Sequence, residues 1–285
     1  DPRDLHSFPT RRSSDLVDAY RYEKELSSLW VKNYPEYIQK GNYPQHIRAT
    51  LKDFLVHQWA NFLGNTNTWR PIELKEKYQI DVALLAANPE SRQLETPEYF
   101  GKIGVHPAQR MVYLLDELYH HHKKAGNLEA ALDTQVERIR KLSALFGKQE
   151  ETRLLIQSLD GLLKPYEQME WWAVGKYEYA ILFQKLDLLT DAYREAQIGY
   201  LKYPGSIGGM QCKSLLDSLK VPHFEIKCMR IDRLQTPSVE IVHKNMDRLY
   251  LRAYKVDFWE WWNRRYRYPG SIDTNDLRDK IHQSS

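Results

Sequence analysis

The spacing of apolar residues changes once along the chain, at about Pro222, and this change limits the folds that are open to it. Over residues 17–219, apolar residues recur every three or four positions, the period of an amphipathic helix. Three later segments alternate between apolar and polar residues, as β-strands do: 224–228 (FEIKC), 239–245 (VEIVHKN) and 249–256 (LYLRAYKV). We therefore predict a mainly α protein, with an irregular helical array before an antiparallel β-domain of the sandwich type.

The clearest helical pattern is LKDFLVHQWANFL, residues 51–63. Its apolar side chains share one face: Leu51, Phe54, Leu55, Trp59, Phe62 and Leu63. The opposite face carries Lys52, Asp53 and Asn61, and we expect it to meet water. Prolines and glycines concentrate in residues 88–107, which predicts a long irregular connection.

Two helix-turn-helix units come next, in residues 107–146 and 171–200, with turns at Gly126-Asn127 and near Leu186-Asp187. Small residues after each turn allow the paired helices to approach closely: Ala130, Ala131, Ala192 and Ala196. The units resemble tetratricopeptide repeats, although their spacing of about 60 residues exceeds the ~34 of a regular array. A third helix over residues 206–219 is expected to be capped by Ser206.

The charge and cysteine content exclude several classes of protein. Lys and Arg number 41 and Asp and Glu 38, and a net charge of +3 gives no support to nucleic-acid or membrane-surface binding. No uninterrupted apolar run reaches the ~18 residues of a membrane span. Two cysteines are too few for a disulfide-dense scaffold or a four-cysteine zinc site.

The first residues resemble a translated sequencing adapter. The stretch HSFPTRRSSDL, residues 6–16, matches the adapter in one frame. We therefore expect residues 1–16 to be disordered, to pack on nothing and to belong to no domain. Two domains are expected, a helical region in residues 17–219 and a β-domain in residues 222–285. We expect the β-domain to be incomplete, because so few strands would leave open sheet edges.

Three segments, taken in order, resemble the N-terminal part of alpha-2-macroglobulin-like proteins of Bacteroidetes-type bacteria. The first is residues 51–63. The second is a junction whose matching residues are Tyr203, Pro204, Ser206, Cys212, Lys213, Leu215, Leu216 and Pro222. The third resembles the first macroglobulin-like β-domain at Asn245, Leu249, Tyr250, Leu251, Arg252 and Lys255. His243, Lys244 and Met246 depart mildly from the family's Tyr, Arg and Val.

The resemblance implies a very long protein of the periplasm or outer cell envelope, in a family that includes protease-trapping macroglobulins. Neither Cys212 nor Cys228 begins a Cys-x-x-Gln sequence, so a bait segment or thioester would lie beyond Ser285. The chain is then a non-catalytic scaffold without a cofactor. Its partners are proteins: proteases through downstream domains, and envelope proteins through helical grooves. The alternative is a stand-alone tetratricopeptide-like adaptor, and an enzyme comes third.

Two patterns of histidine and cysteine are candidate sites. His120, His121 and His122 point in three directions on a helix, so they cannot share one metal ion, and we expect a solvated face with one packed histidine. Cys212 and Cys228 lie 16 residues apart, on a helix and a strand. A disulfide between them stays open, although the family pattern has only the first cysteine and favours two separate thiols.

Aromatic and acidic patterns suggest no further site. Residues 258–268 (FWEWWNRRYRY) mix aromatics with arginines, as single-strand nucleic-acid grooves do, but the near-neutral charge favours packing on the sheet. Trp171 and Trp172 are expected between helices. Glu150 and Glu151 diverge on a helix and suit no acid/base pair. We predict no catalytic, cofactor or metal residues.

Overall fold

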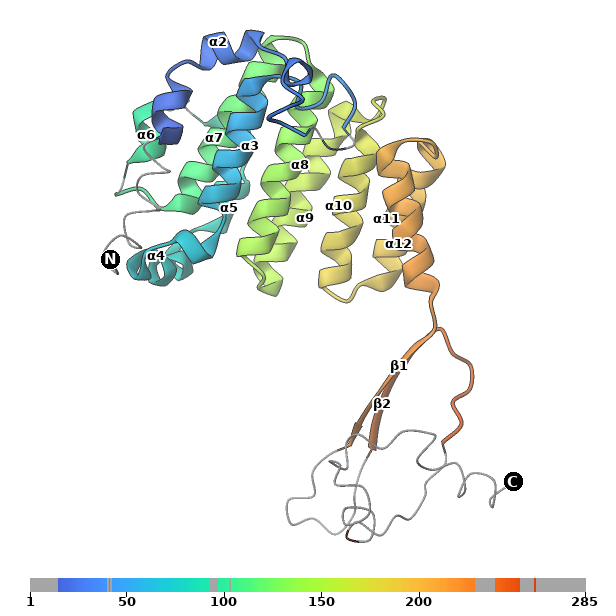
Figure 1. Ribbon diagram of the computed structural model, residues 1–285. Helices are drawn as coiled ribbons and strands as arrows, with labels where there is room; N and C mark the ends of the chain where they lie inside the picture. The colour runs from blue at the N-terminus through green and yellow to red at the C-terminus, as the bar shows by residue number, and fades with distance from the viewer. Residues whose placement is uncertain are drawn as a thin grey trace. The chain divides into compact units, whose positions relative to one another are not determined.

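The computed structural model describes residues 15–39, 41, 43–92, 97–102, 104–228, 239–251 and 259. The chain divides into two compact units, Asp1–Lys220 and Val221–Ser285 (Figure 1). The first is helical, and the second contains a two-stranded antiparallel sheet, so the predicted mainly α fold with strands at its end is confirmed at this level. Among the described residues, no helix is long and apolar enough to cross a membrane.

The described chain begins inside the helical unit. Residues 15–20 are helical, and Tyr20 packs edge-on against Trp59 and Phe100, with ring centroids 5.7 and 5.8 Å apart. Leu16 is partly buried against the same core. The prediction that residues 1–16 pack on nothing is therefore wrong at Leu16, while residues 1–14 lie outside the described part of the chain.

Helix α3 (Leu51–Leu63) comes after the short elements α2 (Glu23–Ser28) and η2 (Val31–Asn33) and has the predicted bounds. Thr50 fixes its start through a capping box. The Thr50 hydroxyl accepts a hydrogen bond from the Asp53 backbone N–H at 3.2 Å, and the Asp53 carboxylate accepts one from the Thr50 backbone N–H at 2.8 Å.

The predicted outward face of α3 is wrong at Lys52 and Asp53, while Asn61 is exposed as expected. Lys52 and Asp53 are buried, whereas Phe54 on the predicted inner face is 37% exposed. Lys52 tolerates burial because its Nζ lies 2.7 Å from Glu23 Oε2 and 3.2 Å from Glu117 Oε1. The pattern of apolar residues could not show these partners, because they come from other elements.

The connection from α3 to the main array consists of short helices. Their bounds are η3 (Thr66–Thr68), α4 (Pro71–Glu76), η4 (Lys77–Gln79), α5 (Val82–Ala86), η5 (Pro89–Ser91) and α6 (Pro97–Gly101). The expectation of an irregular connection over residues 88–107 is therefore wrong in part, because η5 and α6 lie within it. Both begin with a proline, which suits the first helical position.

The array itself consists of antiparallel helix pairs with the bounds α7 (Pro107–Lys124), α8 (Leu128–Leu145), α9 (Gln149–Leu163), α10 (Trp172–Lys185), α11 (Leu189–Lys202) and α12 (Ile207–Lys220). The short η6 (Lys164–Tyr166) comes directly after α9. The predicted turns are present: Gly126 and Asp187 adopt φ values of 76° and 59°. The pairs α7/α8, α9/α10 and α11/α12 recur about every 40 residues. The two predicted helix-turn-helix units are present as α7/α8 and α10/α11, beginning at Pro107 and Trp172, and α9 lies between them in the sequence.

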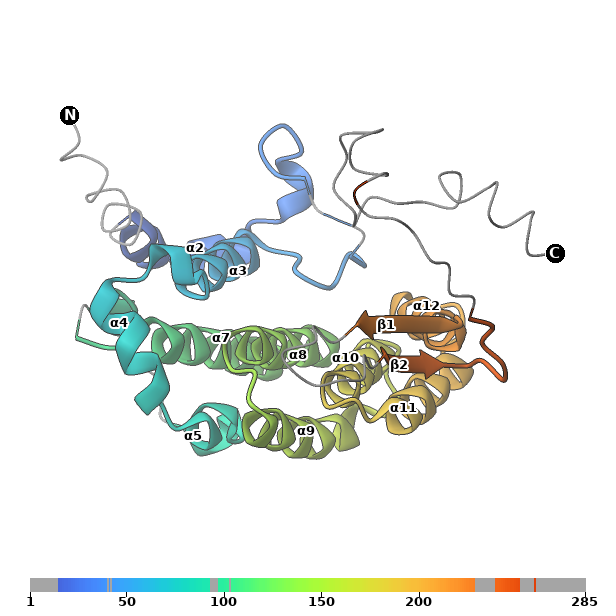
Figure 2. The same ribbon diagram turned by 90° about the horizontal axis from the view of Figure 1, so that it is seen from below.

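Helices α7, α8 and α10 lie in one layer, and α5, α9 and α11 lie in a second (Figure 2). The small residues named from the sequence, Ala130, Ala131, Ala192 and Ala196, are all buried at helix contacts. Trp171 and Trp172 are each 5% exposed, which confirms their predicted place in the core.

Helix α12 begins where expected, and its first turn lies directly on neighbouring backbone. The Ser206 hydroxyl accepts a hydrogen bond from the Gly209 backbone N–H at 2.8 Å, as a helix cap does. A Cβ at Gly208 would lie 2.1 Å from the Val174 backbone nitrogen. Only glycine allows this approach of α12 to α10.

In the second unit, β1 (His223–Cys228) pairs with β2 (Val239–Lys244), with Ile226 opposite Ile241. Both strands are confirmed. The third predicted strand, residues 249–256, is wrong at residues 249–251, which form no strand, and the rest of it lies outside the described residues. Of residues 258–268 only Trp259 is described, and it is exposed.

Candidate functional site

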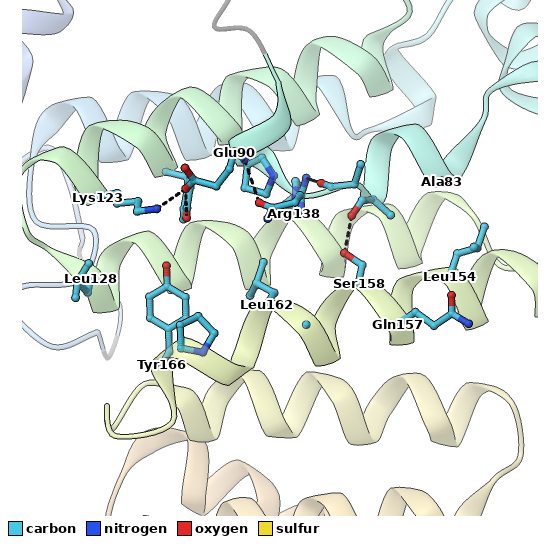
Figure 3. A pocket seen from close by; sticks show the side chains of 17 residues that line it. Ala83, Glu90, Lys123, Leu128, Arg138, Leu154, Gln157, Ser158, Leu162 and Tyr166 are labelled. Atoms are coloured by element: carbon cyan, nitrogen blue, oxygen red, sulfur yellow. Dashed lines mark hydrogen bonds and ion pairs between the residues drawn. The ribbon is translucent and has the colours of Figure 1, made fainter.

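A groove with a volume of about 680 Å³ runs along α9 in the helical unit (Figure 3). One wall comes from α5 and η5, and the other from α9 and η6. The end of α7 contributes Tyr119 and Lys123, and α8 contributes Leu128 and Arg138. Much of its surface is small or apolar, with Ala83, Ala86, Leu128, Leu154, Leu162 and Pro165 among the lining residues. Leu128 and Tyr166 mark one end in Figure 3, and Leu154 and Gln157 the other.

The wall at α5 is held by side chains that bond to the end of the helix. The last carbonyl groups of a helix have no partner within it. Arg92 Nη2 donates to three such carbonyls, those of Leu84, Leu85 and Ala87, at 2.6, 2.7 and 3.0 Å. The Ser158 hydroxyl on α9 donates to the Ala86 carbonyl at 2.5 Å. These bonds fix the wall to α9.

A fully buried arginine, Arg138 of α8, lies in the same wall. Its Nη1 donates to the Ala87 carbonyl at 2.9 Å and lies 3.3 Å from Asp116 Oδ1. Asp116 also pairs with Arg92 through its other oxygen. Burial lowers the pKa of Arg138 to about 10, so the guanidinium remains charged at neutral pH.

One carboxylate therefore serves two guanidinium groups behind the groove. Within the described part of the chain, Nε and Nη2 of Arg138 have no hydrogen-bond partner. A buried donor without a partner costs free energy, and a charged one costs more.

The groove is also lined by a hydrogen-bonded group that consists of Glu90, Tyr119 and Lys123. The Tyr119 hydroxyl donates to Glu90 Oε1 at 2.6 Å, and Lys123 Nζ donates to the same oxygen at 2.6 Å. The hydrogen bonds from Lys123 and Tyr119 lower the pKa of Glu90. Burial and the bond to Glu90 raise the pKa of Tyr119, so its hydroxyl stays a donor.

A second charged cluster lies on the opposite face of α8. Arg48 Nε lies 2.8 Å from Asp133 Oδ2, and Arg140 Nη1 lies 2.6 Å from Glu137 Oε2. Arg140 Nη2 also lies 2.7 Å from Glu178 Oε1. Burial alone would raise the pKa of Glu137, but Arg140 and Arg48 lower it to about 2. Each of these charges has an opposite charge beside it.

The three adjacent histidines lie in different surroundings, as the helical geometry predicts. His122 Nε2 lies 2.7 Å from Asp53 Oδ1 in the core, and His120 Nε2 lies 3.2 Å from the Pro89 carbonyl oxygen. Burial would raise the pKa of Asp53, but the bonds from His122 and Thr50 lower it to about 2. Among the residues that the structure describes, no group of three or more His, Cys, Asp or Glu is placed to hold a metal ion.

Cys212 is a free, buried cysteine in the contact of α12 with α10 and α11. Its Sγ lies 3.6 Å from the Ala173 carbonyl oxygen, and burial raises the pKa of the thiol to about 12. A thiol with such a pKa is not ionised at neutral pH and is a poor nucleophile. The side chain of Cys228 lies outside the described part of the structure.

The patterns in the sequence do not predict the groove residues. One signal is present: Gln135 and Arg138 lie on the same helical face as Ala131 and Leu142, where an amphipathic helix would carry apolar residues. Charged residues in such positions often take part in buried networks.

No family model, no curated protein and no solved structure matches the chain.

Proposed function

We propose that the chain is a non-catalytic scaffold segment of a macroglobulin-like protein of the cell envelope, and that its helical unit acts by binding other proteins. The observation that carries this proposal is the change from helical array to antiparallel strands at Val221, at the junction that resembles the family. A resemblance in sequence motifs weighs more when the matching residues have structural roles.

Several matching residues have such roles. Ser206 caps α12, and Cys212, Leu215 and Leu216 are buried in the contact of α12 with its neighbours. The Tyr203 hydroxyl donates to the Glu167 carbonyl at 3.0 Å, which ties the end of α11 to the loop before α10. The residues of the junction motif therefore hold α12, the last helix before the strands, against its neighbours.

A second candidate is a stand-alone adaptor built from tetratricopeptide-like helix pairs. The groove along α9 favours it, because stacked helix pairs commonly bind extended protein segments in such surfaces. Both candidates assign binding to the helical unit. They differ in the domains expected downstream of Ser285.

The test is to sequence the gene downstream of the codon for Ser285. Repeated β-domains in the same frame are expected, with or without a Cys-Gly-Glu-Gln sequence. A stop codon soon after Ser285 would overturn the macroglobulin-like assignment and favour the adaptor.

A biochemical test addresses the absence of catalysis and trapping. The purified chain is mixed with a panel of endoproteases, and cleavage of a protein substrate and of a small peptide is followed. No stoichiometric loss of cleavage and no hydrolysis by the chain itself are expected. Hydrolysis that disappears in Cys212→Ala would contradict the non-catalytic role.

A further inference from the structure

Residues 15–28, called the N-terminal segment below, cover an apolar surface of the helical unit. Of these residues, all of which the structure describes, Tyr20 alone is buried, and its ring meets those of Trp59 and Phe100. Helix α2, at the end of the segment, has no buried residue and packs on α3 (Figure 2). Segments with so few buried side chains open locally before the rest of a fold does.

The polar contacts of the segment converge on one carboxylate of α7. The Tyr20 hydroxyl donates to Glu117 Oε2, and Lys52 Nζ of α3 lies 3.2 Å from Glu117 Oε1. The same nitrogen lies 2.7 Å from Glu23 Oε2 of α2. Lys52 is buried, so a single shielded ammonium joins α2 to α7. These contacts and the Tyr20 ring hold the segment in place.

The cluster contains more carboxylates than positive groups to balance them. Glu23 and Glu117 share the ammonium of Lys52, and because both lie against one nitrogen, their carboxylates are within about 6 Å of each other. Two carboxylates this close do not both ionise readily, so one keeps a proton to a higher pH. Burial raises the pKa of Glu117 to about 7, and its side chain is 16% exposed against 29% for Glu23. The shared proton therefore belongs to Glu117.

The other titratable groups around Glu117 do not supply a further positive charge. Burial and the charge of Lys52 lower the pKa of His121, so its ring is neutral near pH 7. The remaining charged side chains pair with one another: His122 with Asp53 at 2.7 Å, and Arg21 with Asp18 at 3.1 Å on the exposed side of the segment. Ionisation of Glu117 thus adds an uncompensated negative charge to a shielded place.

We propose that the N-terminal segment is a pH-dependent clasp, which closes over Trp59 and Phe100 while Glu117 holds a proton and opens when Glu117 loses it. Protonated Glu117 can donate from Oε2 to the Tyr20 oxygen, while Oε1 still accepts from Lys52. When the segment opens, Tyr20 and α2 withdraw, and water solvates the ionised carboxylate.

The direction of the pH effect follows from proton binding in the two states. In the open state Glu117 has the ordinary pKa of about 4.5, and in the closed state burial raises this pKa to about 7. The closed state therefore binds the proton more tightly, and its population falls as pH rises between these values. Mild acid fastens the segment, and neutral or alkaline pH releases it.

Amide hydrogen exchange of the full chain, measured from pH 5 to 8, tests the proposal. The exchange rate of each peptide is divided by that of the same peptide in the unfolded chain at the same pH, which gives a protection factor. The protection factor of residues 17–28 is expected to fall by up to about tenfold per pH unit between pH 5 and 7, and to change little above pH 7. Peptides from α8 are not expected to follow this change.

Three variants assign the effect to Glu117. Glu117→Gln keeps the shape of the side chain but cannot ionise, so the protection of residues 17–28 should no longer depend on pH. Glu150→Gln is the matched control, since Glu150 is exposed on α9, and it should leave the dependence unchanged. Glu23→Gln removes the competing carboxylate, so Glu117 should ionise more readily and the loss of protection should move down by about one pH unit.

Three outcomes would overturn the clasp: protection of residues 17–28 that does not vary with pH, the same variation in Glu117→Gln, or an equal variation in α8, which would indicate unfolding of the whole unit. If Glu117→Gln does not fold, the shift in Glu23→Gln decides the result. The proposal is independent of the macroglobulin-like assignment, which the gene sequence tests separately.

Discussion

Helix α8 carries charged residues on two opposite faces, and the two faces satisfy them differently. On one face, Asp133 and Glu137 each lie against an arginine from another segment or from α8 itself. On the other, Arg138 shares Asp116 with Arg92 and retains two nitrogens without an acceptor among the described residues. Both faces are buried, so exposure does not separate them.

The difference indicates different roles for similar residues. A paired buried cluster fixes the elements that meet there, and removal of one member leaves a charge without compensation. In the other cluster one carboxylate is shared by two arginines, so removal of Arg138 leaves Asp116 paired with Arg92. Substitutions at and around these residues test the contrast, in order of expected effect.

The largest effect is expected for Asp133→Asn. Asp133 accepts from Arg48 and from the Trp171 indole at 3.2 Å, so its neutralisation leaves buried donors facing a weaker acceptor. Breaking a buried pair in this way costs about 4 kcal/mol of unfolding free energy. Urea denaturation measures this loss of unfolding free energy. In the control Asp160→Asn, the exposed pair with Lys164 should change stability by less than about 0.5 kcal/mol; equal losses would refute the contrast.

His57, beside the paired cluster, should make stability depend on pH. Burial, together with Arg48, lowers the pKa of His57 from 6.5 to about 4. Between these pH values the unfolded chain binds a proton that the folded chain does not, so stability falls as pH decreases from about 6.5 to 4. This dependence amounts to about 3 kcal/mol and should disappear in His57→Gln.

The measurement is the difference between wild-type and His57→Gln unfolding free energies at several pH values. Burial raises the pKa of Glu117 to about 7, and this gives stability an opposite dependence on pH. Glu117 is present in both proteins, so its effect cancels in the difference and only that of His57 remains. Parallel curves for the two proteins would show that His57 is not the group responsible.

Substitutions at two glycines test the packed side and the open side of α9. A Cβ at Gly175 on α10 would lie 2.2 Å from Leu163 Cδ2, so Gly175→Ala should cost about 1–3 kcal/mol. At Gly161 the space is open, and Gly161→Ala should stabilise the chain by about 0.5–1 kcal/mol through helix propensity. Thermal unfolding distinguishes the two. Destabilisation by Gly161→Ala would mean that the groove is filled in the free protein.

The smallest change is expected for Arg138→Met. Asp116 keeps Arg92 as a partner, and the excess buried charge is removed, so the two effects nearly cancel. Stability should stay within about 1 kcal/mol of wild type in urea denaturation. A loss as large as that of Asp133→Asn would show that Arg138 belongs to a complete structural network.

The bounds of α3, α7 and α8 could be predicted from the sequence because local signals mark them. Thr50 caps α3, Pro107 begins α7, and Gly126 with its positive φ separates α7 from α8. Helix α9 is harder to recognise, since its buried residues, Leu155, Leu159 and Leu163, recur only every fourth position between polar residues.

The site itself could not be predicted, for a physical reason. Lys52 is buried because Glu23 and Glu117 reach it, and the groove forms because Arg92 and Ser158 bond to the end of α5. The partners of Lys52 lie 29 and 65 residues away and Ser158 lies 72 residues from Ala86, while Arg92 follows α5 closely but is separated from it by η5. A periodicity argument assigns each residue to a face from its neighbours on the same helix, so it places buried ion pairs on the outside.

The burial of Cys212 allows the opening of the helical unit to be measured from the rate at which this thiol reacts. Its sulfur is fully shielded by α10, α11 and α12, and its high pKa leaves almost no thiolate at neutral pH. An alkylating reagent can then reach it only during openings of the last helix pair. The rate of Cys212 modification, followed by mass spectrometry of the peptide that contains it, therefore reports how often α12 detaches, without any label having to be introduced.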